Sequence, residues 1–279
     1  MKTKLRLCFV VALFSFTANA FAQDSNFYIF LCFGQSNMDG AGRIEQQDKT
    51  VDQRFQVLAA LDAPKQDRKK GHWYPAVPPL CRGTGGLGPA DYFGRTMVAN
   101  LPANIRVGVV NVAVPGCKIE LFEKDTFTTY TATVPPWMTN FIKEYDGNPY
   151  QHLVNMAKVA QKDGVIKGIL LHQGESNPND KDWPKKVKGI YDNLIRDLNL
   201  KAEEVPLLAG ETVHADQRGV CAGMNRIIAE LPRTLPNSYV ISSAGCTCSP
   251  DRLHFDSAGY RLFGTRYAER MLTVLGYPR

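Results

Sequence analysis

Three residues of this chain are of the types that together make a serine nucleophilic: Ser36 near the beginning, and Asp251 and His254 near the end. A serine hydroxyl attacks poorly until a base removes its proton, and that base must be oriented by a third group. In Asp251-x-x-His254, one loop can place the carboxylate against Nδ1 of the imidazole and leave Nε2 free for Ser36. The pattern therefore predicts a serine hydrolase with Ser36 as nucleophile, His254 as general base and Asp251 as the orienting acid.

Attack on a carbonyl also requires hydrogen-bond donors for the oxyanion that develops. The candidates are the backbone N–H of Ser36, a backbone N–H from the segment 85–89, and the side-chain amide of Gln173. Glycine at position 86 would let the main chain approach a substrate without a Cβ in the way. The same segment can also be read simply as the turn into a helix that begins near Pro89.

A strand must present Ser36, and Phe27–Phe33 is a continuous apolar run that ends directly before Gly34-Gln35-Ser36. Four further apolar, β-branched runs follow at 105–114, 165–172, 205–209 and 239–243, and between the runs lie segments with helical spacing at 89–101, 150–161, 184–198, 217–231 and 257–275. Continuous apolar strands that alternate with amphipathic helices are typical of a parallel sheet covered on both faces. We therefore predict an α/β protein with a three-layer α/β/α doubly wound parallel sheet of about five strands.

Polar clusters follow two of these strands at the point where each ends. Gln35-Ser36-Asn37 follows the first strand, and the segment 173–177 follows the third. Ligands of doubly wound sheets bind outside the carboxyl ends of the strands, so both clusters are expected at the site. A central first strand would allow the late loop with His254 to return to Ser36.

Two long segments, 43–87 and 115–148, interrupt the alternation of strands and helices. Both are rich in proline, glycine, aromatic and charged residues. Segments of this length in a compact domain are usually functional or disordered. We interpret them as walls of a substrate cleft. The alternative is that they are surface loops without a role at the site.

Residues 1–22 have the pattern of a secretory signal, with Lys2, Lys4 and Arg6 before an apolar run and small residues at Ala20 and Ala22. The run is too short to span a bilayer. We predict that the segment is removed, that 23–279 forms one domain without membrane insertion, and that the protein is secreted or periplasmic. Removing the three cations lowers the formal net charge from +6 to +3, so no nucleic-acid partner is implied. The oligomeric state stays open.

The cysteines and histidines give no metal pattern. Cys8 lies in the predicted signal, and six cysteines remain in an oxidising compartment, where some disulfide pairing is expected although its connectivity is not readable. Cys32 lies within a strand and is expected to be a packed free thiol. Cys246-Thr247-Cys248 lacks the C-x-x-C spacing, and no histidine pairs with another at i, i+4. We predict neither a metal nor a cofactor.

Two other residues compete for roles at the site. Ser176 is a rival nucleophile, but no strand-to-helix turn directly precedes it to expose it. The chain has no G-x-S-x-G elbow, which disfavours an ordinary α/β-hydrolase. Glu175 could orient the site, contact His254 in place of Asp251, or accept backbone N–H bonds within its loop. Its role stays open at this point.

Four blocks, in order, resemble those of the SGNH hydrolase superfamily: Gly34-Gln35-Ser36-Asn37-Met38, Gly86-Leu87-Gly88-Pro89, His172-Gln173-Gly174-Glu175-Ser176-Asn177 and Asp251-Arg252-Leu253-His254-Phe255. More narrowly they resemble the sialate O-acetylesterase-like branch that includes carbohydrate esterase family 6, the acetylxylan esterases. The resemblance implies a flavodoxin-like fold and the triad given above. It also implies oxyanion donors at Ser36, Gly86 and Gln173, with Gln35, Glu175 and Asn177 as supporting residues. Gln173 replaces the asparagine of the wider superfamily.

The expected function is therefore that of an exported carbohydrate O-acetylesterase, whose partner is an acetylated carbohydrate, first of all xylan. Two alternatives stay open: a sialate O-acetylesterase, or a carbohydrate-binding protein with an inactive esterase fold. Trp73, Trp137 and Trp183 could stack on sugar rings, or could anchor the core and its loops.

Overall fold

The structure of the protein is a computed structural model that describes residues 23–277. The predicted signal segment, 1–22, lies outside the described residues, and so does Cys8. Across the described part of the chain, no helix combines the length and the apolar character needed to cross a membrane.

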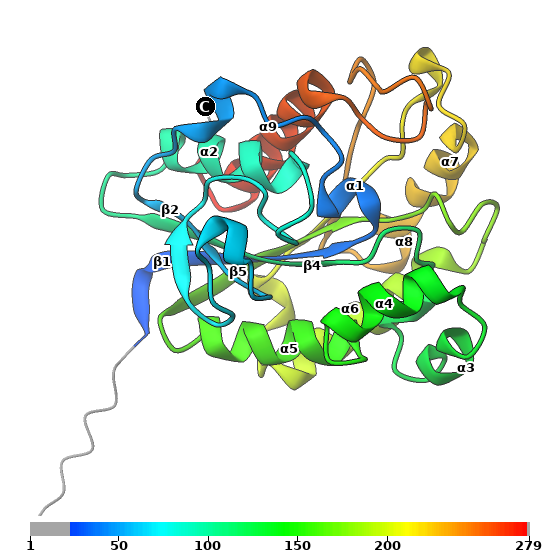
Figure 1. Ribbon diagram of the computed structural model, residues 1–279, viewed down its shortest axis with the longest axis horizontal. Coiled ribbons are helices and arrows are strands. Elements are labelled where there is room, and N and C mark those ends of the chain that lie inside the picture. Colours follow the sequence, from blue (N-terminus) through cyan, green and yellow to red (C-terminus); the bar gives the residue numbers. More distant parts are fainter. Residues whose placement is uncertain (1–22, 278–279) are drawn as a thin grey trace, which may run out of the picture.

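A seven-stranded sheet forms the centre of the fold, with the strand order β3-β2-β4-β1-β5-β6-β7 (Figure 1). Each pair of neighbours is parallel except β2 and β3, which are antiparallel. The strands are β1 (Asp24–Gly34), β2 (Phe55–Leu58), β3 (Trp73–Pro75), β4 (Arg106–Ala113), β5 (Gly164–His172), β6 (Leu207–Gly210) and β7 (Ser238–Ile241).

Strand β1 is central because its apolar run can be buried on both faces. Phe27 and residues 29–33 are all fully buried, and β1 pairs with β4 on one side and β5 on the other. Burying side chains of this size from water stabilises the fold by roughly 1.5–3 kcal/mol each. The strand that leads to Ser36 is therefore fixed from both edges and both faces.

Helices cover the two faces of the sheet and make three layers. Figure 1 shows α2 and α9 on one face, and α5 and α6 on the other. The helices are α1 (Ser36–Asp39), α2 (Pro89–Asn100), α3 (Phe127–Thr131), α4 (Pro136–Glu144), α5 (Pro149–Ala160), α6 (Trp183–Asp197), α7 (Asn225–Ile228), α8 (Leu231–Thr234) and α9 (Ser257–Val274). Two buried apolar clusters, one for each face, fill the space between the layers.

The predicted fold class, a three-layer sheet of mostly parallel strands, is confirmed, but the sheet has two more strands than expected. Both come from the segment 43–87, in which β2 extends the parallel sheet beyond β4 and β3 adds an antiparallel edge. The segment 115–148 holds the 3₁₀ turn Ile119–Phe122 and the helices α3 and α4. Both segments thus carry secondary structure of their own.

The helix predicted over 217–231 is wrong. The chain forms instead a 3₁₀ turn at Ala222–Met224 and two single-turn helices, α7 and α8. Gly219 and Gly223 lower the helix propensity of this segment, and Pro232 sits in the first turn of α8, where its missing N–H costs nothing.

Candidate active site

Ser36 lies at the carboxyl edge of the sheet, where β1 passes into the single-turn helix α1. Gln35 is still extended, and Ser36 is the first helical residue. The turn needs glycine at position 34, because an added Cβ there would lie 2.0 Å from the carbonyl oxygen of His172 on β5. The close approach of β1 to β5 thus fixes the point at which the chain leaves the sheet.

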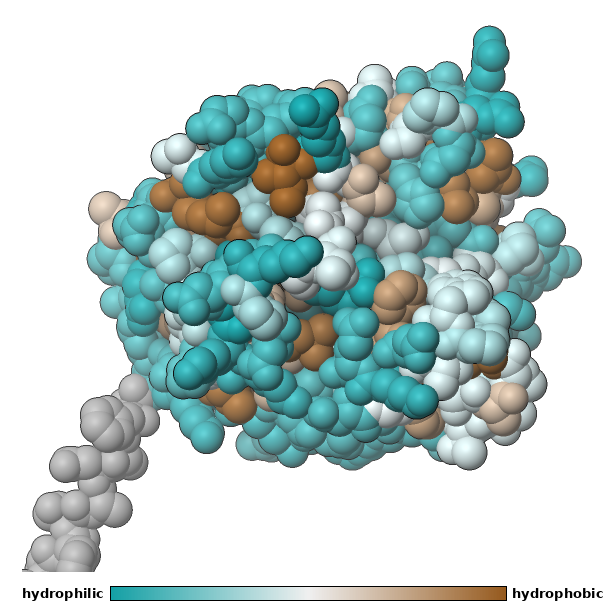
Figure 2. Space-filling model, viewed as in Figure 1, coloured by the Kyte–Doolittle hydropathy of each residue, from teal (hydrophilic) through white to brown (hydrophobic). Residues whose placement is uncertain are grey.

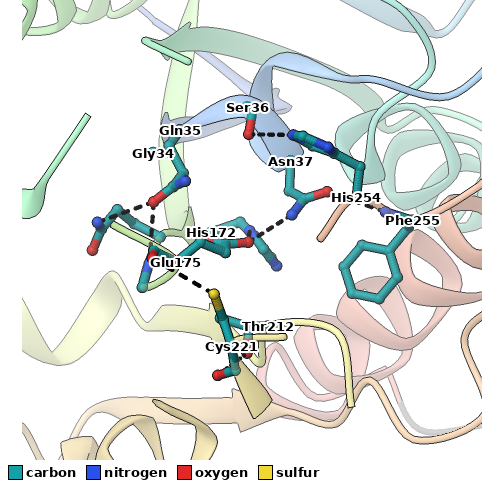
Figure 3. Close-up of polar contacts among 12 residues, drawn as sticks. Gly34, Gln35, Ser36, Asn37, His172, Glu175, Thr212, Cys221, His254 and Phe255 are labelled. Atoms are coloured by element: carbon teal, nitrogen blue, oxygen red, sulfur yellow. Dashed lines mark hydrogen bonds and ion pairs between the residues drawn. The ribbon is translucent and has the colours of Figure 1, made fainter. Parts of the chain in front are cut away.

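The structure brings Ser36, His254 and Asp251 together, as the sequence predicted. Nε2 of His254 lies 2.8 Å from Oγ of Ser36, and Nδ1 lies 2.7 Å from Oδ2 of Asp251. Figure 3 shows the imidazole turned toward the Ser36 hydroxyl. The His254 side chain is 24% exposed, so the group that would move the proton is accessible from solvent. This arrangement can perform nucleophilic catalysis.

Asp251 holds the His254 loop as well as its ring. Oδ1 of Asp251 accepts the backbone N–H groups of Leu253 and His254, at 2.9 and 3.0 Å. Burial on its own would raise the pKa of Asp251, but the hydrogen bonds from the His254 ring and from these N–H groups outweigh it and hold the pKa below its ordinary value. Asp251 therefore stays ionised as the pH falls, until the pH drops through that lowered pKa.

Asn37 joins the nucleophile helix to the His254 loop. Its fully buried side chain donates from Nδ2 to the carbonyl oxygen of Leu253 at 3.0 Å, and its Oδ1 accepts the backbone N–H of Phe255 at 3.3 Å. Leu253 and Phe255 are the two neighbours of His254, so Asn37 holds the base from both sides. Oδ1 also accepts the hydroxyl of Tyr260 on α9.

Replacing Asn37 with alanine should lower both stability and turnover. The loss leaves buried partners unsatisfied, and we expect the free energy of unfolding to fall by about 2–4 kcal/mol. We also expect kcat to fall, because the His254 loop loses its hold on α1. Urea unfolding and steady-state kinetics with an aryl acetate would measure the two effects.

Asn225→Ala is the matched control for the Asn37 variant. Asn225 is also buried, and it bonds the backbone and hydroxyl of Thr212, but it contacts neither Ser36 nor the His254 loop. We expect a similar loss of stability with kcat unchanged. Equal kcat values for the two variants would show that Asn37 has only a stabilising role.

Glu175 contacts Asn37 and does not reach His254. Its Oε1 accepts Nδ2 of Asn37 at 2.6 Å and lies 3.5 Å from Nδ1 of His172, while Oε2 is buried and has no hydrogen-bond partner within residues 23–277. Of the roles left open by the sequence, the geometry fits orientation of the site, because Glu175 fixes the side chain that holds the His254 loop (Figure 3).

Two of the predicted oxyanion donors have internal partners. The N–H of Gly86 donates to the carbonyl oxygen of Gly40 at 2.7 Å. The amide nitrogen of Gln173, which is fully buried, lies 2.6 Å from Oδ1 of Asn177, with further acceptors on Gln35 and Cys117. Either donor would have to break these bonds to reach a substrate, so the donor role predicted for Gly86 and Gln173 is not supported.

Gln35 instead presents a donor that has no partner. Its Oε1 accepts Nε2 of Gln173 at 3.1 Å and lies near the N–H groups of Gly174 and Ser176, at 3.5 and 3.4 Å. These donors fix the orientation of the amide, and in the described part of the chain its Nε2 makes no hydrogen bond. The backbone N–H of Ser36, the first in α1, likewise has no acceptor within its helix. These two N–H groups belong to the nucleophile and to the residue directly before it.

The remaining candidates have structural partners. Ser176 donates its hydroxyl to the carbonyl oxygen of Gly116 at 2.9 Å, which leaves it no base. Asn177 accepts the N–H of Ile119 at 2.9 Å and so fastens the segment after β4 to the one after β5. Among the tryptophans, Trp183 is fully buried and donates to Gln173, Trp73 packs on Phe27, and Trp137 is 51% exposed.

The expected disulfide pairing does not occur among residues 23–277. All six cysteines there are free thiols, and Cys32, Cys81, Cys117 and Cys246 are buried. Cys32 is the packed thiol predicted from its place in β1, and burial raises its pKa far above the ordinary value. Within the same residues, no group of three or more His, Cys, Asp or Glu side chains could hold a metal ion.

Comparisons with known proteins give a family and a common fold. Residues 26–273 match the model of a protein family described as "Carbohydrate esterase, sialic acid-specific acetylesterase". A solved structure from Arabidopsis thaliana is similar with a TM-score of 0.67 at 21% identity, and the match covers 91% of this chain and 100% of that one. NanS is similar with a TM-score of 0.67 at 17% identity, over 91% and 98% of the two chains.

A third solved structure is a carbohydrate acetylesterase from Xanthomonas citri. Its TM-score is 0.61 at 16% identity, and the match covers 88% of this chain and 56% of that one. At these identities the likeness shows a common fold.

Proposed function

The chain belongs to the carbohydrate esterase family of sialic acid-specific acetylesterases, and from this premise we propose that it hydrolyses acetyl esters on a polysaccharide, first of all acetylated xylan, through an acetyl-enzyme. The observation that carries the proposal is the continuous pair of hydrogen bonds from Asp251 through His254 to Ser36. The xylan assignment is supported by the resemblance of the sequence blocks to carbohydrate esterase family 6.

In the first half of the reaction, His254 removes the proton from Ser36 as Oγ attacks the acetyl carbonyl carbon. The negative charge that develops on the carbonyl oxygen is stabilised by the N–H of Ser36 and the amide of Gln35. The C–O bond to the sugar then breaks, and the sugar oxygen takes the proton from His254. Asp251 stabilises the imidazolium while it carries that proton.

In the second half, water attacks the acetyl group on Ser36. His254 takes a proton from that water, and the same donors hold the second oxyanion. The bond between the acetyl carbon and Oγ breaks, His254 returns the proton to Ser36, and acetate leaves. The complete reaction consumes only the ester and water.

Replacing Gln35 with glutamate tests the revised donor assignment. The substitution keeps Oε1 as an acceptor and exchanges the amide N–H₂ for an oxygen of nearly the same size. Removing one oxyanion donor typically lowers kcat 10²–10³-fold, and we expect a loss on the order of 10²-fold with KM changed little. An unaltered kcat in a folded Gln35→Glu variant would show that the donor lies elsewhere.

The second candidate function is removal of acetyl groups from sialic acid, and the description of the matched family favours it. The experiment that separates the two is a comparison of acetate release from acetylated xylan and from O-acetylated sialic acid under the same conditions. We expect the higher kcat/KM on xylan. A higher value on sialic acid would replace the first candidate with the second.

We also propose that the protein acts outside the cytoplasm, either secreted or in the periplasm, because of the signal pattern in residues 1–22. Cleavage after this segment would be seen as a mature N-terminus near residue 23 in the exported protein. An exported protein that keeps Met1 would contradict the proposal.

A further inference from the structure

A second feature of the same edge of the sheet is a cavity of about 620 Å³ beside the carboxyl end of β2. It is lined by the segment that follows β2, by residues 82–84, and by Glu144 and Asp146 at the end of α4. This volume lies within the range of about 300–1,000 Å³ that is usual for small-molecule sites. The two long segments that were interpreted from the sequence as cleft walls supply these residues.

The cavity adjoins the nucleophile helix through a buried ion pair. Arg82 lines the cavity, and its Nη2 lies 2.8 Å from Oδ2 of Asp39, the last residue of α1. Both side chains are more than nine-tenths buried. Phe141 packs against the guanidinium group, 4.2 Å from its ring centroid. Ser36 opens the same single turn of helix that Asp39 closes, so one helical turn joins the nucleophile to the wall of the cavity.

The lining carries a balanced set of charges held in place. Nζ of Lys70 lies 2.8 Å from Oδ2 of Asp146, and the backbone N–H of Lys70 donates to Oδ1 of Asp62. Nη1 of Arg82 lies 3.8 Å from Oε2 of Glu144. With Lys65, the wall has three cations and three carboxylates, which gives no net charge. Lys65 is exposed and makes no ion pair within the described residues. A wall without net charge does not select for an anion, whereas a neutral ligand with hydroxyl groups could bond to groups of both signs.

The lining also has apolar surface, from Leu61, Ala63 and Pro64. Sugar rings combine C–H faces with hydroxyl groups, so they match a wall of this mixed character. Figure 2 shows that hydrophilic side chains dominate the visible face of the molecule and that hydrophobic ones gather only in small separate groups. Surfaces that bind a protein partner typically expose a larger continuous apolar patch.

We propose that this cavity is a glycan subsite. It binds an uncharged sugar unit of the polysaccharide whose acetyl ester is presented to Ser36. The inference rests on the proposed function and deepens it, because such a subsite selects a neutral polysaccharide over a single acidic sugar. The subsite acts through binding, so its loss raises KM for long substrates. The kcat/KM for a short aryl acetate stays unaffected.

The kinetic test uses Lys65→Ala, which removes a hydrogen-bond donor, and Thr84→Trp, which fills the cavity from an exposed lining position. The substrates are an aryl acetate and acetylated xylo-oligosaccharides of increasing length. For the longer oligosaccharides we expect KM to rise roughly fivefold or more in both variants, the usual size of one lost hydrogen bond. For the aryl acetate we expect kcat/KM to stay within about twofold.

The matched control is Lys185→Ala, which removes an exposed lysine from α6, outside the cavity lining. It should behave as the unchanged protein on every substrate. If Lys65→Ala and Thr84→Trp also do so, the cavity is not a subsite, and the inference is overturned.

A binding measurement separates this inference from the proposed function. Calorimetry with unacetylated xylohexaose requires no hydrolysis, and we expect its Kd to rise roughly fivefold in Lys65→Ala. Equal or tighter binding of sialyllactose at the same cavity would overturn the assignment to uncharged sugars. If Lys65→Ala weakens the binding of xylohexaose but the unaltered protein releases no acetate, the subsite assignment stands and the esterase proposal fails.

Discussion

Ser36→Ala lowers kcat/KM for an aryl acetate on the order of 10⁵-fold, because it removes the nucleophilic hydroxyl that lies 2.8 Å from Nε2 of His254. The residual activity comes from the oxyanion donors and from substrate binding alone. Steady-state kinetics would give the ratio, and mass spectrometry after rapid quenching should find an acetyl group on Ser36 only in the unchanged protein.

Ser176→Ala is the control for this result. Ser176 is the rival nucleophile in the sequence, and its hydroxyl donates to the carbonyl oxygen of Gly116. We expect kcat/KM within about threefold of the unchanged value, because only one hydrogen bond is lost. Full turnover in Ser36→Ala with loss of turnover in Ser176→Ala would exchange the two assignments.

His254→Ala lowers kcat on the order of 10⁴-fold. Without the imidazole, no side chain within residues 23–277 is placed to take the proton from Ser36 or to return it to the leaving sugar oxygen. The loss should be smaller than for Ser36→Ala, because solvent reaches this position and water can serve as a weak base. His214→Ala is the control, since His214 accepts the N–H of Asp216 at 3.3 Å in a separate turn. Its turnover should equal that of the unchanged protein.

The pH profile of kcat/KM tests the same base in the unaltered protein. Activity falls on acidification because a protonated imidazole cannot accept a proton from Ser36. Asp251 contributes to that fall only once the pH drops through its own pKa, which hydrogen bonds from the His254 ring and backbone hold below the ordinary value. A profile that stays flat down to about pH 4 would contradict the role of His254.

The strands β1, β4 and β5 could be predicted because each contains a long, mostly apolar run, which is the pattern of a strand buried on both faces. Strands β2 and β3 could not. They are only four and three residues long, and β3 is the sequence Trp73-Tyr74-Pro75, whose proline is tolerated because β3 is an edge strand. β2 pairs with β4, which comes later in the chain, and β3 pairs only with β2 in the described sheet.

The members of the triad could be predicted because the chemistry demands a serine, a base and an acid, and the sheet topology brings them to one edge. The oxyanion donors could not be predicted with the same success. Whether an amide is free depends on the groups around it in space, and the partners of Gln173 come from the residue after β1, from the segment after β4 and from the segment after β5. The role of Asn37 depends in the same way on a loop more than two hundred residues away.

The position of β1 between β4 and β5 has a consequence for how the protein is made. The ribosome produces β1 first, yet its partners follow only at residues 106–113 and 164–172. At roughly 5–20 residues per second, the segment between β1 and β5 takes roughly 7–26 s to synthesise. Until β5 follows, one edge of this apolar strand has no partner strand in the sheet. Ser36 is synthesised more than two hundred residues before His254, so the two can meet only after synthesis has passed residue 254.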